Sequence, residues 1–391
     1  PATNATSPTF ATKVDFTTGS RPLSVSIGDI NGDGKPDLAV ANVNDSTVSI
    51  LLNTTTIGAA TPTFATQVTF PTGPGPRTVS IADFNSDGKP DLTAVNYDSN
   101  NVSILFNITP ALAATPTFSP QVLFATGLGP YFAGIGDINT DGKPDLAVGN
   151  LGSGNVSILL NTTPTGAATP TFAPQALFGT GSGPFSISIG DINGDGKPDL
   201  AVANTNDNNV SILLNTTTGA GPLTFTPQVT FATGTKPISV SIGDFNGDGK
   251  PDLAVSNYDS NNISILINTS TAGATTPSFV PQVTFPTGAI PYFVSIGDIN
   301  SDGKPDLAVA NIGGSNTVSI LLNTTFKVTS VTATTPDGTY GVGSTIAITV
   351  TFDAPVTVPG TPQLQLETGT TDQFANYASG SGTTALTFNY V

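Results

Sequence analysis

The chain has 391 residues, a formal net charge of −16, and no Cys, His, Met or Trp. The lack of Cys excludes disulfide bonds, thiol catalysis and zinc–thiolate sites, and the lack of His removes the commonest general base and metal ligand. The acidic balance argues against a nucleic-acid partner, because such binding depends on Lys and Arg that neutralise phosphates. No apolar run approaches the roughly 18 residues that a membrane span needs.

The composition is typical of a β-rich protein with many turns. Gly and Pro are abundant, at 42 and 32 residues, and Glu367 is the only Glu. The sequence does not begin with Met, and we expect its N-terminus to be internal to a precursor, as the loss of a signal peptide would explain. We therefore expect a secreted, extracellular or cell-surface protein.

The predicted strands follow one another at short intervals. The first covers residues 10–16 and the next covers residues 23–28. An acidic loop at 29–37 leads into strands at 38–41 and 47–52, and the next strand covers residues 64–70. Most of them alternate apolar and polar residues with a period of two, and all are bounded by turn residues, which is the pattern of short strands in a half-buried sheet.

The acidic loop is the most regular feature of the chain. Its nine-residue pattern, D-x-N-x-D-G-K-P-D, occurs six times at intervals of 53 or 54 residues. The six copies hold 18 of the 27 acidic and six of the 11 basic residues, so each loop carries a net charge of −2. A turn needs one Asp or Asn, and three Asp in every copy indicate a cation site. The copies begin at Asp29, Asp83, Asp137, Asp191, Asp244 and Asp298.

Oxygen ligands at alternate positions, with Gly at the sharp turn, are typical of loops that wrap Ca²⁺. Position 12, where an EF-hand has a bidentate Glu, is Val40 in the first copy, so we expect Asp37 to close the shell. We therefore expect about six Ca²⁺ ions, one per repeat. The predicted ligands are Asp29, Asn31, Asp33, the carbonyl of Lys35, and Asp37; Asp83, Asn85, Asp87, Lys89 and Asp91; Asp137, Asn139, Asp141, Lys143 and Asp145; Asp191, Asn193, Asp195, Lys197 and Asp199; Asp244, Asn246, Asp248, Lys250 and Asp252; and Asp298, Asn300, Asp302, Lys304 and Asp306.

Four short strands per repeat predict an all-β chain containing a β-propeller of four-stranded blades. A flat solenoid is the alternative, but its units are usually shorter. Six repeats predict six blades within residues 1–324. The strand at 10–16 has no blade before it, and the last repeat lacks an outer strand, so we expect residues 10–16 to close the sixth blade.

These repeats resemble the FG-GAP/VCBS repeats of bacterial surface proteins, which are related to the integrin α-chain propeller. The resemblance rests on Ile27-Gly28-Asp29, the acidic loop, and Leu38-Ala39-Val40. It covers about four fifths of the chain and implies that the acidic loops bind Ca²⁺. Two departures are Ala82, where the other copies have Gly, and six visible blades where the integrin type has seven. The chain also contains no Arg-Gly-Asp.

Residues 325–391 lack the acidic loop and form a second predicted domain. Alternating strands are predicted at 326–334, 345–352, 362–367, 373–378 and 384–391. This part resembles the Ig-like repeats of bacterial adhesins, which implies a β-sandwich. The segment is short for a sandwich, so we expect an incomplete one with an edge open to strand addition.

Three other features are weaker candidates for sites. Aromatic residues open three inner strands, at 131–132, 185 and 292–293, and we favour packing over a ligand pocket. No pair of carboxylates outside the loops stands out for glycoside hydrolysis, so we expect no enzyme. Twelve Asn-x-Ser/Thr sequons occur, and we favour an ordinary strand-end role over glycosylation: Asn4, Asn44, Asn53, Asn101, Asn107, Asn155, Asn161, Asn209, Asn215, Asn262, Asn268 and Asn323.

Together these patterns predict a non-enzymatic, calcium-stabilised extracellular protein with a structural or adhesive role. Its partners would be further copies of the chain, joined through the C-terminal domain into a surface filament. One alternative is a lectin-like propeller that binds surface glycans. Another is the non-catalytic module of a larger secreted enzyme.

Overall fold

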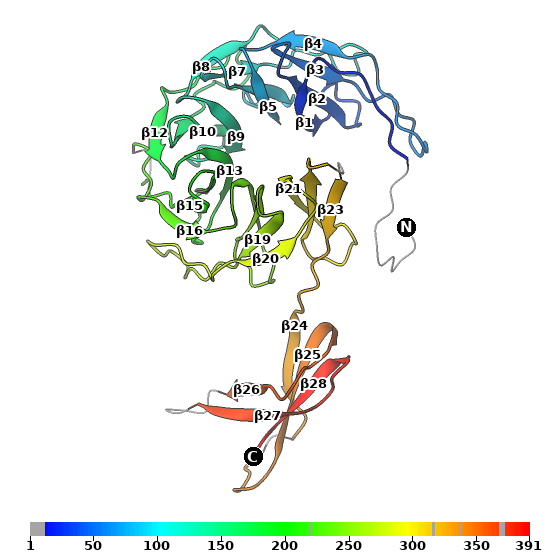
Figure 1. Cartoon of the computed structure of the whole chain (residues 1–391), viewed down its shortest axis with the longest axis vertical. Helices are drawn as coiled ribbons and strands as arrows, with labels where there is room; N and C mark the ends of the chain where they lie inside the picture. The colour runs from blue at the N-terminus through cyan, green and yellow to red at the C-terminus, as the bar shows by residue number, and fades with distance from the viewer. Residues whose placement is uncertain (1–11, 219–220, 315–316, 337, 367–371) are drawn as a thin grey trace. The chain divides into compact units, whose positions relative to one another are not determined.

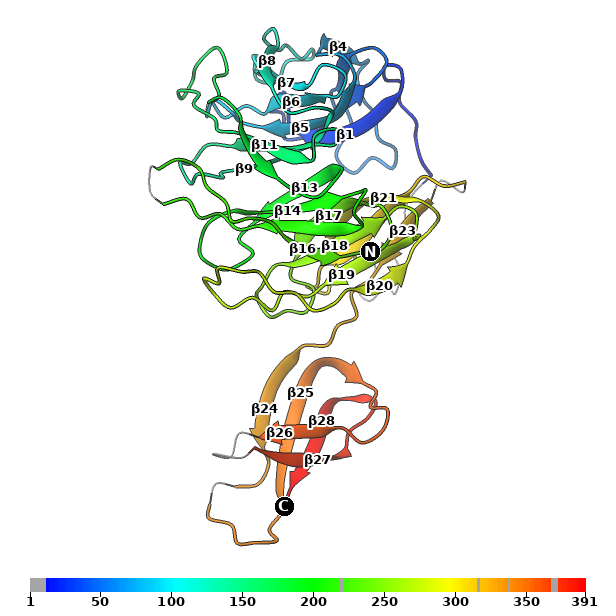
Figure 2. The ribbon, with the colours of Figure 1, turned by 60° about the vertical axis from the view of Figure 1, so that its left-hand side comes forward.

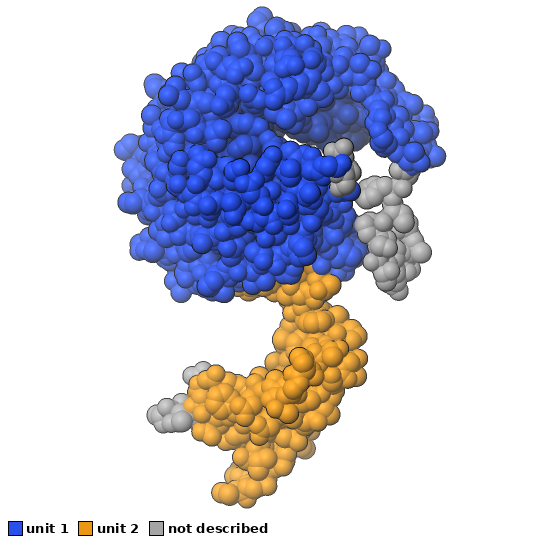
Figure 3. Space-filling view, in the orientation of Figure 1, with its two compact units in different colours: residues 1–244, 249–322 blue, residues 245–248, 323–391 orange. Residues whose placement is uncertain are grey.

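The computed structural model describes residues 12–218, 221–314, 317–336, 338–366 and 372–391. These residues form strands and turns, and no helix among them is long and apolar enough to cross a membrane. The chain divides into two compact units, one of residues 1–244 and 249–322 and one of residues 245–248 and 323–391 (Figure 3). The division lies next to the predicted boundary between residues 324 and 325.

The first unit consists of six antiparallel sheets, arranged one after another around an arc (Figures 1 and 2). Within each sheet the strand order follows the chain. The innermost strands are β1 (Pro22–Gly28), β5 (Pro76–Ala82), β9 (Pro130–Gly136), β13 (Pro184–Gly190), β17 (Pro237–Gly243) and β21 (Pro291–Gly297). The second strands are β2 (Asp37–Asn42), β6 (Asp91–Asn96), β10 (Asp145–Asn150), β14 (Asp199–Asn204), β18 (Asp252–Asn257) and β22 (Asp306–Asn311).

The third strands are β3 (Thr47–Leu51), β7 (Asn101–Leu105), β11 (Asn155–Leu159), β15 (Asn209–Leu213), β19 (Asn262–Leu266) and β23 (Thr317–Leu321). The outer strands are β4 (Val68–Pro71), β8 (Val122–Ala125), β12 (Ala176–Gly179), β16 (Val229–Ala232) and β20 (Val283–Pro286). These repeated four-stranded sheets confirm the predicted propeller architecture.

The core lies between successive sheets. All six residues of β6 are buried, because a neighbouring sheet covers each of its two faces. One apolar cluster joins Ile50 of the first sheet to Val79 and Leu92 of the second. Full burial of such a side chain contributes about 1.5–3 kcal/mol, so each blade depends on its neighbours for stability.

The outer strands are shorter than predicted. The strand expected at 64–70 begins at Val68, and Phe64 makes only an isolated bridge with Asn53. Four of the five copies have a proline two residues after the bridging Phe, and proline lacks the N–H that a strand ladder needs. These prolines are Pro120, Pro174, Pro227 and Pro281.

The predicted pairing of residues 10–16 is absent from the described residues. Residues 12–16 form no strand, residues 10 and 11 lie outside the described range, and the sixth sheet has three strands. Phe16 instead packs edge-on against Phe64, with ring centroids 4.9 Å apart. Lys13 and Asp15 pair with each other in solvent at 2.7 Å. The segment is thus held by side chains of the first sheet rather than by backbone hydrogen bonds to the sixth.

The second unit contains a single five-stranded antiparallel sheet in the order β24-β25-β28-β27-β26. Its core includes Val350, Ala375, Leu386 and Phe388. The strands agree with those predicted to within a few residues, although the end of the third, at Glu367, lies outside the described range. The Ig-like assignment remains a prediction, because the described residues form one sheet. The strands are β24 (Val328–Ala333), β25 (Ile346–Val356), β26 (Gln363–Leu366), β27 (Gln373–Ser379) and β28 (Thr383–Tyr390).

Candidate metal centre

Each acidic loop joins the end of an innermost strand to the start of the second strand in the same sheet. In the first copy, Asp29 accepts hydrogen bonds from the backbone N–H groups of Asp33, at 3.0 Å, and Gly34, at 2.8 Å. Asn31 Oδ1 also accepts from Asp33 N–H at 3.2 Å, and Asp33 Oδ1 accepts from Lys35 N–H at 3.0 Å. The side-chain oxygens at positions 1, 3 and 5 therefore turn toward the backbone of their own loop.

The loop curls because two of its residues adopt left-handed backbone conformations. Position 6 is Gly in every copy, with φ of 82° at Gly34 and 86° at Gly142, as the predicted sharp turn requires. Position 4 also has positive φ, including 54° at Ser86 and 60° at Thr140. This second turn was not predicted, although position 4 is Gly in three of the six copies, as at Gly32 with φ of 70°.

The Asp at position 9 is fully buried in all six copies. Asp91 accepts hydrogen bonds from the N–H groups of Phe84, at 2.9 Å, and Asn107, at 2.7 Å. It therefore ties the start of the loop to the residue that follows the third strand. Position 9 was predicted only as a metal ligand, and this structural role was not predicted.

Burial raises the pKa of the carboxyl group at position 9 in the first four copies of the loop. The pKa rises to about 7 for Asp91 and Asp145 and to about 6 for Asp199, and it also rises for Asp37. Hydrogen bonds from backbone N–H groups oppose this rise, and nearby acidic side chains of the same loop add to it. In Asp37, Asp91, Asp145 and Asp199, the cost of burying the charge therefore outweighs the hydrogen bonds that favour the carboxylate.

Only some of the five predicted ligands in each loop lie close to one another. Among the described residues, no three acidic side chains gather closely enough to hold a metal ion. Positions 1, 3 and 5 share the loop backbone, whereas position 9 is held by N–H groups at the base of the loop. The donor set nevertheless fits Ca²⁺ chemically, because it consists of carboxylate and amide oxygens in a loop of net charge −2.

Adjacent blades are tied together at the acidic loops by asparagine side chains. Asn107 Nδ2 donates to the Ile30 carbonyl in the loop of the preceding blade at 2.8 Å, and Asn161 donates in the same way to the Phe84 carbonyl. Both asparagines belong to sequons and are 1% exposed. The structural role favoured for these strand-end sequons is therefore confirmed at four buried positions: Asn107, Asn161, Asn215 and Asn268.

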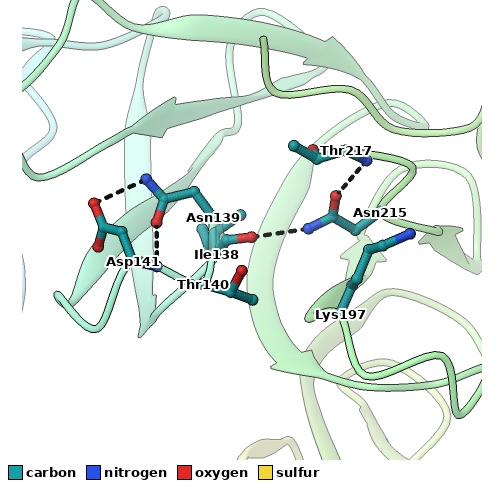
Figure 4. Close-up of a pocket in the computed structure, with 7 residues that line it drawn as sticks. All are labelled: Ile138, Asn139, Thr140, Asp141, Lys197, Asn215 and Thr217. Atoms are coloured by element: carbon teal, nitrogen blue, oxygen red, sulfur yellow. Dashed lines mark hydrogen bonds between the residues drawn. The ribbon is translucent and has the colours of Figure 1, made fainter. Parts of the chain in front are cut away.

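One polar pocket of about 340 Å³ lies between the loop of the third blade and the fourth blade (Figure 4). Asn139, Thr140 and Asp141 line one side, and Lys197 and Asn215 line the other. Asn215 spans the boundary by donating to the Ile138 carbonyl at 2.9 Å. The pocket thus follows the seam between two blades at the level of the acidic loops.

The profile of the FG-GAP-like repeat family matches residues 3–40, 29–94, 137–202, 191–255 and 244–309. These matches together cover more than half of the chain. No curated protein matches the sequence.

Solved structures of low sequence identity are similar to the chain in fold. A humanized mutant of the Chaetomium thermophilum Polycomb Repressive Complex 2 is 13% identical, with a TM-score of 0.52 over 74% of this chain and 65% of that one. BBS1N in complex with ARL6DN is 14% identical, with a TM-score of 0.46 over 95% and 97% of the two chains. Saccharomyces cerevisiae Sqt1 is 10% identical, with a TM-score of 0.45 over 85% and 96%. The first of these likenesses supports the propeller fold and says nothing about activity.

Proposed function

The chain belongs to the FG-GAP-like repeat family, and we propose that it is a non-catalytic, calcium-stabilised extracellular propeller with a structural or adhesive role. FG-GAP repeats typically form non-catalytic propeller modules of extracellular or surface proteins. The observation that carries the calcium proposal is the sixfold recurrence of an all-oxygen loop of net charge −2 at the same end of every sheet. The ligands would be the five positions predicted in each loop.

In this proposal calcium compensates charge and fixes a turn. A bound Ca²⁺ would supply the positive charge that the clustered carboxylates of each loop need. It would draw positions 1, 3 and 5 toward the carboxylate at position 9, which already holds the loop to the third strand. Because Asn107 anchors the next blade to the Ile30 carbonyl of this loop, fixing the loop also stabilises the contact between blades.

We also propose that residues 12–16 close the ring by pairing with β23. Val318 in β23 is 64% exposed. The equivalent residues of the other five sheets, each covered by an outer strand, are 0% exposed: Val48, Val102, Val156, Val210 and Ile263. The sixth sheet therefore presents an apolar edge where the others have a fourth strand.

The residues that follow the N-terminal segment make the same contact as the residues that follow an outer strand elsewhere in the ring. Gly19 N–H donates to Ser49 Oγ at 3.3 Å, as Gly73 N–H donates to Ser103 Oγ at 3.1 Å. The segment after Phe16 thus follows the path of the connection between β4 and β5. Because Phe70 faces Val48 in the first sheet, the same register places Phe16 opposite Val318 and Asp15 opposite Ser319.

Disulfide trapping tests this closure, because the chain has no Cys of its own. Directly opposed residues of an antiparallel pair lie about 4.5–5.5 Å apart at Cα, within the range that a disulfide spans. We expect the Asp15→Cys/Ser319→Cys variant to form an intramolecular disulfide on mild oxidation, seen as faster migration in non-reducing electrophoresis.

The control pair for this experiment is Asp15→Cys/Ser264→Cys, because β20 already covers Ser264. This pair should remain reduced. Failure of the first pair to react would contradict the closure. Intermolecular ladders alone would also contradict it and would indicate strand exchange between copies.

We propose that the second unit joins copies of the chain through β24. This strand lies at the edge of its sheet, and all six of its residues are exposed, including Val328 and Val331. An exposed edge strand presents unpaired N–H and C=O groups to a strand of another chain. This observation favours the filament over an isolated particle.

Electron microscopy tests the filament proposal. We expect filaments of the native chain in calcium and their loss in the Val331→Lys variant, because an edge lysine opposes strand addition. The control is Val342→Lys, which places the same charge on an exposed loop residue outside the strands. Discrete particles of the native chain, or equal filament loss in both variants, would contradict the role of β24.

A further inference from the structure

A group of aromatic side chains and one arginine lies where the innermost strands begin. We call Arg77, Tyr97, Tyr131, Phe185, Tyr258 and Tyr292 the central cluster. They come from five of the six sheets, and they include every Tyr of the first unit. The three other tyrosines of the chain lie in the second unit, at positions 340, 377 and 390.

The aromatic members pack against one another across the ring. The hydroxyl groups of Tyr131 and Tyr292 lie 2.6 Å apart and join the third sheet to the sixth. The ring of Phe185 lies over that of Tyr131 with centroids 3.9 Å apart. Burial and the Tyr131 hydroxyl raise the pKa of Tyr292, so its hydroxyl stays protonated. Tyr131, Phe185 and Tyr292 therefore pack against one another, as predicted.

Packing does not account for Arg77. Its guanidinium lies 4.6 Å from the ring centroid of Tyr97 and 5.8 Å from that of Tyr131. Its Nε is buried and has no hydrogen-bond partner among the described residues. Lys236 is a contrast, because it lies over Tyr258 and also pairs with Asp259 at 2.8 Å.

The repeats themselves show that an arginine is not needed at this position. The first residue after the proline that opens the innermost strand is Leu23 in the first sheet and Ile238 in the fifth. The innermost strand therefore forms with an aliphatic residue at the position equivalent to Arg77. A partly buried cation costs desolvation free energy unless an anion or hydrogen-bond acceptor compensates it. The place of Arg77 therefore indicates an anionic group supplied from outside the chain.

The central cluster and the acidic loops lie at opposite ends of the innermost strands. Tyr131 is at the start of β9, and the third acidic loop follows its last residue, Gly136. Seven residues of strand separate the two ends by roughly 20 Å. The clustered carboxylates of the loops are therefore remote from Arg77.

We propose that the central cluster binds a carboxylate-bearing sugar, such as the uronic acid units of an acidic glycan. The planar fork of an arginine matches a carboxylate with two parallel hydrogen bonds. Tyrosine rings offer apolar faces to a sugar ring and hydroxyl groups to its polar edge. A single Arg supplies one positive charge, which suits a monocarboxylate. This site is separate from the calcium loops, and its failure would leave the calcium proposal intact.

Binding of a galacturonic acid trimer to the whole chain tests the proposal, with its fully methyl-esterified form as the matched ligand. Tyrosine fluorescence reports on the site, because the chain has no Trp and four of its seven Tyr belong to the cluster. At one fixed calcium concentration, we expect saturable binding of the acid and at least about tenfold weaker binding of the ester, since the ester lacks the charge-assisted bonds.

Three variants isolate the role of the guanidinium. Arg77→Gln should weaken binding of the acid at least about tenfold, while Arg77→Lys, which keeps the charge but loses the fork, should weaken it less. Arg21→Gln, which removes the other arginine of the chain, should leave binding unchanged. Equal binding of acid and ester, equal loss in both glutamine variants, or no binding of the acid at millimolar concentration would each overturn the proposal.

Discussion

Removal of calcium should lower the melting temperature of the propeller by on the order of 20 °C. Extracellular calcium modules have Kd values of about 10⁻⁴–10⁻³ M. At a calcium concentration about 100 times Kd, each site adds about 2.7 kcal/mol, so six independent sites add about 16 kcal/mol. The unfolding entropy grows with chain length, so for about 300 residues each kcal/mol of stability shifts the melting temperature by about 1.5 °C. Calorimetry in 10 mM calcium and in excess EGTA measures the difference.

Loss of one site should have a correspondingly smaller effect. Asp33→Ala in calcium should lower the melting temperature by about 4 °C, whereas in EGTA the variant and the native chain should melt alike. The matched control is Asp98→Ala, which removes an acidic residue from the turn after β6 and should not alter the response to calcium. A melting curve of the native chain that EGTA leaves unchanged would refute the structural role of calcium.

The regular parts of the fold could be predicted because each repeat carries its own local signals. The strand pattern, the turn residues and the period of the acidic loop predicted the six sheets and the strands of the second unit. The outer strand was predicted to be too long, since alternation continues back to Phe64, which makes only an isolated bridge; four of the five copies also have a proline there, such as Pro120, that cannot donate to the ladder. Alternation shows which face a residue occupies, but it does not show whether a backbone N–H is present to pair.

The candidate metal loops could be predicted in composition but not in arrangement. Asp and Gly at fixed spacing identify the loop, because few other functions need three carboxylates in nine residues. The role of Asp91 as a buried acceptor for Asn107 N–H depends on a residue 16 positions away, and no local pattern reports it. The contact from Asn107 to Ile30 spans 77 residues, so it becomes visible only when neighbouring blades are stacked.

The contacts of Arg77, at the other end of the innermost strands, also could not be predicted from the sequence. In the sequence it is one of two arginines and stands in a turn-rich stretch without a motif. The aromatic rings that its guanidinium contacts belong to Tyr97, in the turn after β6, and to Tyr131, in the next sheet. Only the closing of several blades around an axis brings them together. A residue that differs between repeats, as Arg77 does, is one by which copies of the same blade can acquire different functions.

In calcium-depleted buffer, the propeller should be more stable at pH 5 than at pH 8. The pKa of Asp91 and of Asp145 rises from 3.8 to about 7 on folding, because burial disfavours the charged form. A raised pKa in the folded state gives stability that is complete below the unfolded value and is lost as the pH rises through the folded value. The loss should therefore fall between about pH 4 and pH 7, and it is on the order of 4 kcal/mol for each group.

Calcium should reverse the sign of this dependence, because the ion requires the deprotonated carboxylates and competes with protons for them. Urea unfolding at pH 5, 6, 7 and 8, in resin-treated buffer and in 10 mM calcium, measures both slopes. Asp145→Asn should reduce the pH dependence of the unfolding free energy in calcium-free buffer by about the contribution of one carboxyl group, since the amide does not titrate. Its oxygen still accepts a hydrogen bond from the N–H of Ile138 or Asn161. Stability that rises with pH in the calcium-free buffer would contradict the buried, uncompensated carboxylates on which both predictions depend.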